Sequence, residues 1–236
     1  MCGIKAALFD LYDTLTYVDR LRYEEKIAKC AAICSIAPDK FLKAWRSLYI
    51  QSTLGIYPTT EERVEAVLDI LKIPRLQEII RDVTAYEHEF LRTGMMLFED
   101  AISTLNSLKT AGLRLGLVTN ASPSVRVLIK KYKLDEYLNA VIVSSEVNCR
   151  KPAEGIYKAA LAELGVEASE SVFVGDGNDN ELKGAEHLGI TTIWVNRGLP
   201  KYQKDETPVV GFDFKAESLE EVRRIIMTMT AAPREF

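Results

Sequence analysis

The sequence predicts an α/β protein: a Rossmann-like, three-layer domain with a parallel sheet, joined to an all-helical cap domain. Near its start, an apolar run over residues 5–9 leads into a carboxylate, Asp10, which is typical of a buried parallel strand with a functional group at its end. From residue 97 onward, apolar runs alternate with amphipathic segments, which indicates parallel strands joined by helical crossovers. Between these regions the pattern is helical throughout, which indicates an inserted helical domain.

Length and composition fit one such domain with its insertion. The chain has 236 residues, and its formal net charge of −4 provides no basic footprint for nucleic acid. No apolar run approaches the roughly 20 residues that cross a bilayer, and no signal-peptide pattern opens the chain. We therefore expect a cytoplasmic protein that acts on a small molecule and binds neither nucleic acid nor membrane. The sequence predicts no particular oligomeric state.

The insertion directly follows the first strand. We assign residues 1–16 and 94–236 to the α/β domain and residues 17–93 to the cap. Proline and glycine interruptions separate four expected cap helices, near 19–34, 38–52, 60–72 and 75–92. Trp45 and Tyr49 share a face of the second helix, and we interpret them as core residues rather than as side chains that face a substrate.

Expected strands and helices alternate along the remainder of the α/β domain. Expected strands cover residues 113–119, 140–144, 171–175 and 191–195. Expected helices cover residues 98–110, 122–132, 152–164, 180–188 and 219–229. Gly112 and Gly165 follow two of these helices, as glycine commonly does at a helix C-terminus.

Polar side chains gather at the ends of these strands. They are Asp10 and Thr14 after the first strand, Thr119 and Asn120 at the end of the second, Lys151 after the third and Asp176 after the fourth. The C-terminal ends of parallel strands lie at one edge of the sheet, where such sheets bind ligands, so we expect these side chains to converge. Carboxylates, a lysine and hydroxyl groups together suit a metal-assisted phosphoryl-transfer site.

Four segments resemble, in order and spacing, the motifs of the haloacid dehalogenase (HAD) superfamily of hydrolases with a helical cap inserted after the first strand. The segments are Phe9-Asp10-Leu11-Tyr12-Asp13-Thr14-Leu15, Val118-Thr119-Asn120, Arg150-Lys151-Pro152 and the acidic stretch Gly175-Asp176-Gly177-Asn178-Asp179-Asn180-Glu181-Leu182-Lys183-Gly184-Ala185. The resemblance covers nearly the whole chain. It implies the α/β domain described above, with the cap between the first and second motifs.

The resemblance also implies a reaction centre. Asp10 would be the nucleophile, attacking phosphorus to form an aspartyl-phosphate or carbon to form an ester. A Mg²⁺ ion would be held by Asp10, by the backbone carbonyl of Tyr12 and by Asp176, and would neutralise the charge of a phosphate dianion.

The other motif residues would support that centre. Lys151 would steady the nucleophile, while Thr119 and the Asn120 amide would donate hydrogen bonds to the transferring group, and Thr14 belongs to the same catalytic set. Asn180 or Glu181 would complete the outer shell of the metal. For Glu181, a structural acid in the first turn of a helix is an equally good interpretation.

Tyr12 departs from the phosphatase pattern. The phosphatases of the superfamily carry a second aspartate at this place, which protonates the leaving group and later activates water. Here Asp13 lies one residue further, on the leaving-group side, and the phenol of Tyr12, with an ordinary pKa of about 10, is a poor general base at neutral pH. This difference predicts slow hydrolysis of phosphoesters.

A tyrosine at this place resembles the 2-haloacid dehalogenases of the same superfamily, whose halide leaves without a proton. Tyr157 fits that branch too, and a dehalogenase needs a cap arginine for the substrate carboxylate, for which Arg20, Arg22 and Arg46 are candidates. The fourth motif differs, because Gly175 and Gly177 stand where that branch carries serine and asparagine.

In the choice between a phosphatase and a dehalogenase, we give the fourth motif more weight than the first. Asp10 and Asp176 in one cleft repel each other unless a cation lies between them, and a metal-free dehalogenase gains nothing from that repulsion. We therefore favour a Mg²⁺-dependent phosphohydrolase that acts on a small phosphorylated metabolite. A 2-haloacid dehalogenase and a catalytically weakened binding protein remain the alternatives.

Overall fold

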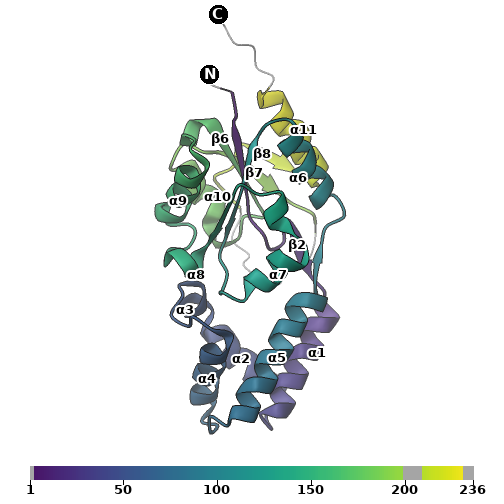
Figure 1. The fold of residues 1–236 in the computed structure, drawn as a ribbon, viewed down its shortest axis with the longest axis vertical. Helices are drawn as coiled ribbons and strands as arrows, with labels where there is room; N and C mark the ends of the chain where they lie inside the picture. The colour runs from purple at the N-terminus through teal and green to yellow at the C-terminus, as the bar shows by residue number, and fades with distance from the viewer. Residues whose placement is uncertain (1–2, 199–208, 231–236) are drawn as a thin grey trace, which may run out of the picture.

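The computed structural model describes residues 3–198 and 209–230. Its central feature is a six-stranded parallel sheet with the strand order β5-β4-β1-β6-β7-β8 (Figure 1). The strands are β1 (Ala6–Phe9), β4 (Arg114–Thr119), β5 (Ala140–Val143), β6 (Ser171–Gly175), β7 (Thr191–Val195) and β8 (Phe214–Ala216). A separate antiparallel pair joins β2 (Thr16–Val18) to β3 (Met95–Leu97).

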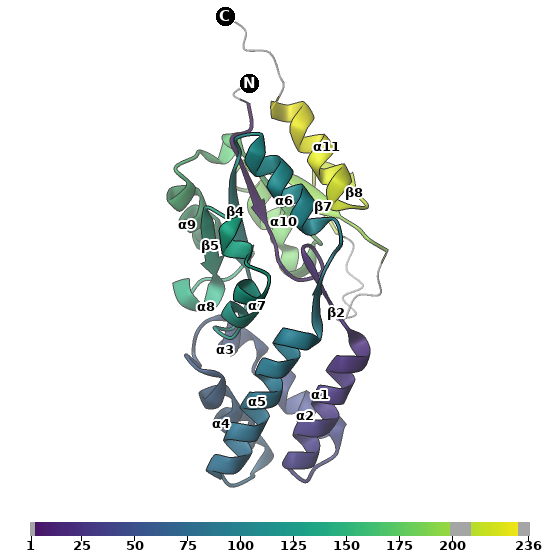
Figure 2. The same cartoon turned by 45° about the vertical axis from the view of Figure 1, so that its right-hand side comes forward.

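Helices cover both faces of the sheet and complete the three layers. On one face lie α6 (Ala101–Thr110), α7 (Val125–Lys131) and α11 (Leu219–Thr230), which share a hydrophobic cluster with β1 and β4 (Figure 2). On the other face lie α9 (Glu154–Leu164) and α10 (Glu181–Glu186), whose apolar side chains form a second cluster with the sheet. The short helix α8 (Ser144–Val147) follows β5. The predicted α/β fold class is confirmed.

Five helices lie between β2 and β3 and form the cap, below the sheet in Figure 1. They are α1 (Arg20–Ile33), α2 (Pro38–Ser47), α3 (Tyr49–Thr53), α4 (Thr60–Leu71) and α5 (Gln77–Thr93). The cap has its own hydrophobic cluster, which includes Phe41, Val64 and Val83. The predicted start of α4 is a capping box, in which Glu62 N donates to Thr59 Oγ1 at 3.2 Å and Thr59 N donates to Glu62 Oε2 at 3.1 Å.

The expected elements are all present, with two differences in the cap and its connections. The second cap helix breaks at Leu48, so Trp45 lies in α2 and Tyr49 in α3. Strands β2 and β3 were not expected, because three residues are too few to show a period. Their pairing, Thr16 opposite Leu97, joins the two connections between cap and sheet. The assignment of residues 17–93 as a domain stays a prediction.

The register of the sheet brings the predicted strand ends together. Phe9 lies opposite both Leu117 of β4 and Val174 of β6, and Asp10 N donates to Val174 O at 2.9 Å. Asp10 therefore lies between the ends of β4 and β6, at the edge of the sheet that faces the cap (Figure 1). Within the described ranges, none of the helices combines the length and the apolar character that crossing a bilayer requires.

Candidate active site

Lys151 and Asp10 form the buried centre of the site. Asp10 directly follows β1 and is 5% exposed, while Lys151 precedes α9 and is 2% exposed. Lys151 Nζ donates to Asp10 Oδ1 and, at 2.5 Å, to Glu181 Oε2. Burial alone would lower the pKa of Lys151, but the two carboxylates raise it above its usual value, so the ammonium stays charged.

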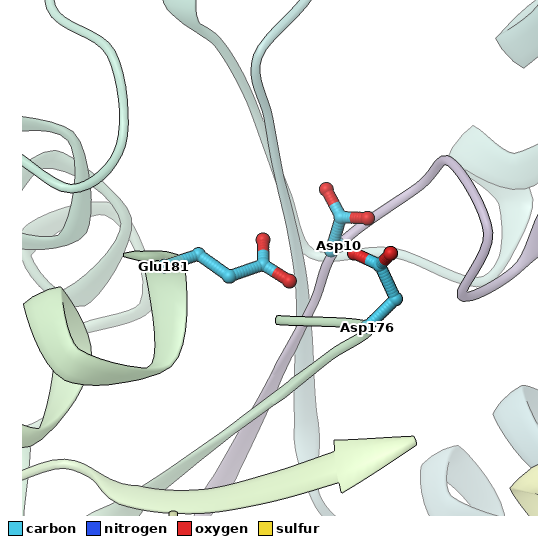
Figure 3. A group of neighbouring side chains, drawn as sticks. All are labelled: Asp10, Asp176 and Glu181. Carbon is cyan, nitrogen blue, oxygen red and sulfur yellow. The ribbon is translucent and has the colours of Figure 1, made fainter. Parts of the chain in front are cut away.

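Three carboxylates cluster at this centre, and Lys151 contacts two of them, those of Asp10 and Glu181. Each of Asp10, Asp176 and Glu181 is buried and offers an oxygen within 4.8 Å of oxygens of the other two, and Figure 3 shows their carboxylates turned toward one another. Burial, followed by the charges of Asp10 and Asp176, raises the pKa of Glu181 well above its ordinary value despite Lys151. The site thus concentrates more negative charge than one lysine neutralises, which favours a bound cation.

The end of β6 is shaped to admit Glu181. A Cβ on Gly175 would collide with the Glu181 carboxylate, so only glycine permits this approach. Gly177 has a positive φ of 86°, and its backbone N–H donates to Glu181 Oε1 at 3.0 Å. Tyr157 holds the first turn of α10 from the other side, because its hydroxyl donates to Glu181 O at 2.7 Å. The glycines of the fourth motif therefore position an acid.

The Asn120 side chain holds the backbone of Lys151. Asn120 Oδ1 accepts from Lys151 N at 2.8 Å, and Asn120 Nδ2 donates to Lys151 O at 3.0 Å. The same amide nitrogen donates to Asp179 Oδ2 at 2.7 Å, an oxygen that also accepts from Arg150 at 2.7 Å. Asn120 thus links the end of β4 to the lysine and to the fourth motif.

Two threonine hydroxyls near these strand ends have no hydrogen-bond partner in the described part of the chain. Thr14 and Thr119 are fully buried, and neither Oγ1 atom forms a hydrogen bond to any residue that the structure describes. Buried hydroxyl groups without a partner are costly and uncommon in folded proteins. These hydroxyls are therefore available to donate hydrogen bonds to a ligand at the edge of the sheet.

These motifs match a known family over most of the chain. The profile of the haloacid dehalogenase-like hydrolases matches residues 4–189. The chain belongs to this family. A glyceraldehyde 3-phosphate phosphatase of Methanopyrus kandleri is 30% identical over 234 residues, which cover 94% of this chain and 98% of that protein.

Dehalogenases of the family are also similar to this hydrolase. An (S)-2-haloacid dehalogenase of a Pseudomonas species is 26% identical, with 84% of this chain and 86% of that protein covered. The crystal structure of a 2-haloacid dehalogenase from Pseudomonas syringae shares the fold with a TM-score of 0.73 and 20% identity, covering 95% of this chain and 99% of the other.

In this haloacid dehalogenase-like hydrolase, Tyr12 is half-buried and lies close to Glu87 and Arg63 of the cap. Burial, and then the charge of Glu87 in α5, raises the pKa of its phenol above the ordinary value, so the hydroxyl keeps its proton at neutral pH. Asp13 adopts a positive φ of 58°, and its N–H donates to Thr16 O at 2.6 Å in the turn that leads to β2.

The structure distinguishes the two residues of the fourth motif that were predicted for the outer shell of the metal, Asn180 and Glu181. Glu181 lies beside Asp10, whereas Asn180 is exposed at the N-terminus of α10. Asp179 and Asn180 both have positive φ, near 55°, and this turn brings the next residue inward. The sequence analysis assigned no role to Asp179, which accepts a hydrogen bond from Asn120. Its place within the fourth motif was the only signal that could have indicated this role.

The cap contributes residues that its sequence pattern does not reveal. Tyr49 was expected in the core, but its hydroxyl donates to Asp179 Oδ2 at 3.3 Å and so links α3 to the α/β domain. Trp45 is buried in the cap cluster, as expected. The predicted cap arginines, Arg20, Arg22 and Arg46, are all exposed, whereas Arg63 of α4 lies close enough to Tyr12 to affect its pKa.

Proposed function

We propose that the protein is a divalent-metal-dependent phosphohydrolase of small phosphorylated metabolites, with Asp10 as the nucleophile. The observation that carries this proposal is the cluster of three buried carboxylates, which offer oxygens within 4.8 Å of one another and of which two contact Lys151. All the donors are oxygen atoms, which suits Mg²⁺, and the excess negative charge fits a divalent cation. A phosphatase relative that matches almost the full length of the chain supports the same reaction class.

In this proposal Asp10, Asp176 and the Tyr12 carbonyl hold the metal, and Glu181 supports it from α10. The bound ion supplies charge neutralisation for the phosphate dianion. Lys151 donates a hydrogen bond to Asp10 Oδ1 and fixes that oxygen, which leaves Oδ2 for attack on phosphorus. Thr14 and Thr119 donate their unpartnered hydroxyl groups to the phosphoryl oxygens.

The reaction has two steps. Asp10 Oδ2 forms a bond to phosphorus while the bond from phosphorus to the ester oxygen breaks, and the leaving alkoxide takes a proton from water or from the Tyr12 hydroxyl. Water then attacks the aspartyl-phosphate, which releases inorganic phosphate and restores the Asp10 carboxylate. The raised pKa of Tyr12 keeps its phenol protonated, so Tyr12 can accept a proton from the attacking water only where it has given its own proton to the leaving alkoxide.

One observation favours dehalogenation as a second candidate. A half-buried, protonated tyrosine at position 12 is sufficient where the leaving group is a halide, which needs no proton. In that reaction Asp10 would displace halide from carbon, and water would then cleave the ester.

The two candidates differ in metal dependence and in product. We expect release of inorganic phosphate from small phosphate monoesters with Mg²⁺, its loss in EDTA, and its recovery when Mg²⁺ is restored. Asp10→Asn should abolish turnover in a folded protein, whereas Asn180→Asp, a change at an exposed position of the same motif, should leave it nearly unchanged. Chloride release from 2-chloropropionate that persists in EDTA, without phosphatase activity, would establish the dehalogenase. No turnover of either substrate class would instead favour the binding protein.

A further inference from the structure

Asp179 lies where the cap, the end of β4 and the lysine motif meet. Its Oδ2 atom accepts hydrogen bonds from Asn120 Nδ2 at 2.7 Å, from Arg150 Nη2 at 2.7 Å and from the Tyr49 hydroxyl at 3.3 Å. The first donor follows β4, the second lies between α8 and α9, and the third belongs to α3 of the cap. One carboxylate oxygen therefore joins three parts of the chain that are far apart in sequence.

Through Asn120, this carboxylate controls the backbone of Lys151. The Asn120 amide accepts from Lys151 N at 2.8 Å and donates to Lys151 O at 3.0 Å. An amide nitrogen has two N–H groups, and here Lys151 O and Asp179 Oδ2 take one each. A reversed amide would turn its oxygen toward the carboxylate and its N–H groups toward Lys151 N. Asp179 thus fixes the orientation in which Asn120 holds the lysine.

The backbone of Asp179 supports the same lysine from a second side. Asp179 and Asn180 have positive φ values of 55° and 54°, a left-handed conformation that aspartate and asparagine tolerate better than most residues. This turn brings Glu181 inward, where its Oε2 accepts from Lys151 Nζ at 2.5 Å. Hydrogen bonds to the Asp179 side chain hold the turn in place. Asp179 therefore supports Lys151 both through Asn120 and through Glu181.

The cap reaches this carboxylate through Tyr49. Burial, followed by the charge of Asp179, raises the pKa of Tyr49 to about 12, so the hydroxyl stays protonated and remains a donor at neutral pH. The Arg150 guanidinium lies 5.3 Å from the centroid of the same ring. Just after α3, Gly55 approaches α8 so closely that a Cβ would lie 2.2 Å from Ser145 O. At this point the cap fits tightly against the α/β domain.

We propose that Asp179 is a positioning residue that couples the cap to Lys151. While the cap is seated, the Tyr49 hydroxyl restrains the Asp179 carboxylate, which holds Asn120 and so keeps the lysine at Asp10. When the cap moves away, the carboxylate loses this bond and the lysine is held less firmly. A displacement of about 1 Å at a reaction centre can cost about 10²-fold in rate. The site is therefore fully assembled only beneath a closed cap. The inference rests on the proposed function only in placing Lys151 at the reaction centre.

An exchange measurement tests the coupling without turnover. Because Lys151 N–H donates to Asn120 Oδ1, hydrogen exchange of this amide, followed by NMR, reports how firmly it is held. Tyr49→Phe removes only the hydroxyl and should speed this exchange about threefold or more, as expected for the loss of one hydrogen bond. Tyr86→Phe, the same change at another half-buried tyrosine of the cap, should leave the rate unchanged. In Asp179→Gly, exchange should be faster still, and Tyr49→Phe should add nothing.

Glycine is the suitable replacement at position 179, because it removes the carboxylate and still permits the left-handed turn. Kinetics with a phosphate monoester then show what the coupling does. Asp179→Gly should lower kcat about tenfold or more and change KM little, because the lysine acts on the transition state. Asp179→Asn keeps an acceptor oxygen and should restore part of kcat. Tyr49→Phe should lower kcat in the parent but not in Asp179→Gly, which a double-mutant cycle measures.

The outcome of the exchange measurement is independent of the proposed function. Unchanged exchange of the Lys151 amide in Tyr49→Phe would overturn the inference even if the protein is a phosphatase. Equal effects of Tyr49→Phe in the parent and in Asp179→Gly would also overturn it, because the hydroxyl would then act by another route. Faster exchange in a protein that turns over no phosphate ester would support the coupling and reject the proposed function. Should Asp179→Gly not fold, the comparison of Tyr49→Phe with Tyr86→Phe decides alone.

Discussion

At the scale of single residues, the candidate active site depends on which hydrogen-bond partner each polar side chain has. Lys151 contacts two of the three acids, and its backbone is held at both ends by the Asn120 amide. Such a lysine has little freedom, which is useful where charge develops during a reaction. The hydroxyl groups of Thr14 and Thr119, in contrast, are kept free of partners among the described residues.

Tyr12 sets the expected rate of phosphoester hydrolysis. Replacing it by aspartate supplies the missing acid and base, so we expect Tyr12→Asp to raise kcat on an alkyl phosphate, with the typical effect of such a group, about 10²–10⁴-fold, as the upper range. The ester para-nitrophenyl phosphate should gain less, because its leaving group needs little protonation. Phosphate release should be followed at saturating Mg²⁺, since the change adds a carboxylate to an acidic site.

Tyr12→Phe is the matched control, because it keeps the ring and removes only the hydroxyl. If the hydroxyl donates the proton to the leaving group, this variant should lose activity on the alkyl ester more than on the aryl ester. An alkyl ester that gains nothing from Tyr12→Asp, together with chloride release by the parent, would support dehalogenation instead.

At the scale of elements, the cap is organised around a buried ion pair between α1 and α5. Lys26 Nζ lies 4.7 Å from the centroid of the Tyr23 ring and 4.9 Å from that of Phe90, and it donates to Glu87. Aromatic faces and a carboxylate together compensate the ammonium. Arg63 of α4 also lowers the pKa of Glu87, so the ion pair and Arg63 belong to one charged cluster of the cap.

This pair predicts a pH dependence of cap stability. Burial by itself raises the pKa of Glu87, but Lys26 and Arg63 hold it below its usual range. Its contribution to stability is therefore fully present above the unfolded-state pKa, near 4.3, and is lost as the pH falls through the lower folded-state value. At pH 7, Glu87→Gln should unfold more easily than the parent by about 3–5 kcal/mol, because it leaves Lys26 unpaired.

The difference should shrink as the pH is lowered toward 3, where the parent loses the same charge. Urea unfolding at several pH values, followed by circular dichroism, measures it. Glu89→Gln, an exposed change in the same helix, should match the parent throughout. A difference for Glu87→Gln that stays constant with pH would show that the carboxylate charge does not stabilise the cap.

At the scale of the whole molecule, the sequence pattern located the strands that carry the site, because apolar runs and their polar ends are local features. It therefore also predicted that Asp10, Lys151 and Asp176 converge. It could not identify Arg63, because nothing local distinguishes an arginine that faces another domain from an exposed one. It left Glu181 undecided between two interpretations, since only the left-handed turn at residues 179 and 180 decides which side chain points inward.

Asp10 directly follows β1, Asp176 directly follows β6 and Glu181 begins α10, so the three acids meet only when the sheet is folded. A cation that binds them therefore stabilises the folded state alone, by about 2.7 kcal/mol at a hundred times its Kd. Without a cation, the same acids repel one another. The proposed metal site thus predicts opposite effects of Asp176→Asn under two conditions.

In EDTA, Asp176→Asn should be at least as stable as the parent, because the change removes one of three crowded negative charges. With increasing Mg²⁺, the melting temperature of the parent should rise and that of Asp176→Asn should stay nearly constant, so the order of the two proteins reverses. Calcium, which also prefers oxygen ligands, should stabilise the parent as well. Asn180→Asp tests whether any added acid near the motif has an effect, and we expect it to follow the parent, because position 180 is exposed.

Parallel responses of the parent and Asp176→Asn to Mg²⁺ would mean that Asp176 does not hold the ion. If neither protein responds, the three carboxylates serve a metal-free reaction, and the repulsion between them is balanced by Lys151 and the raised pKa of Glu181 alone.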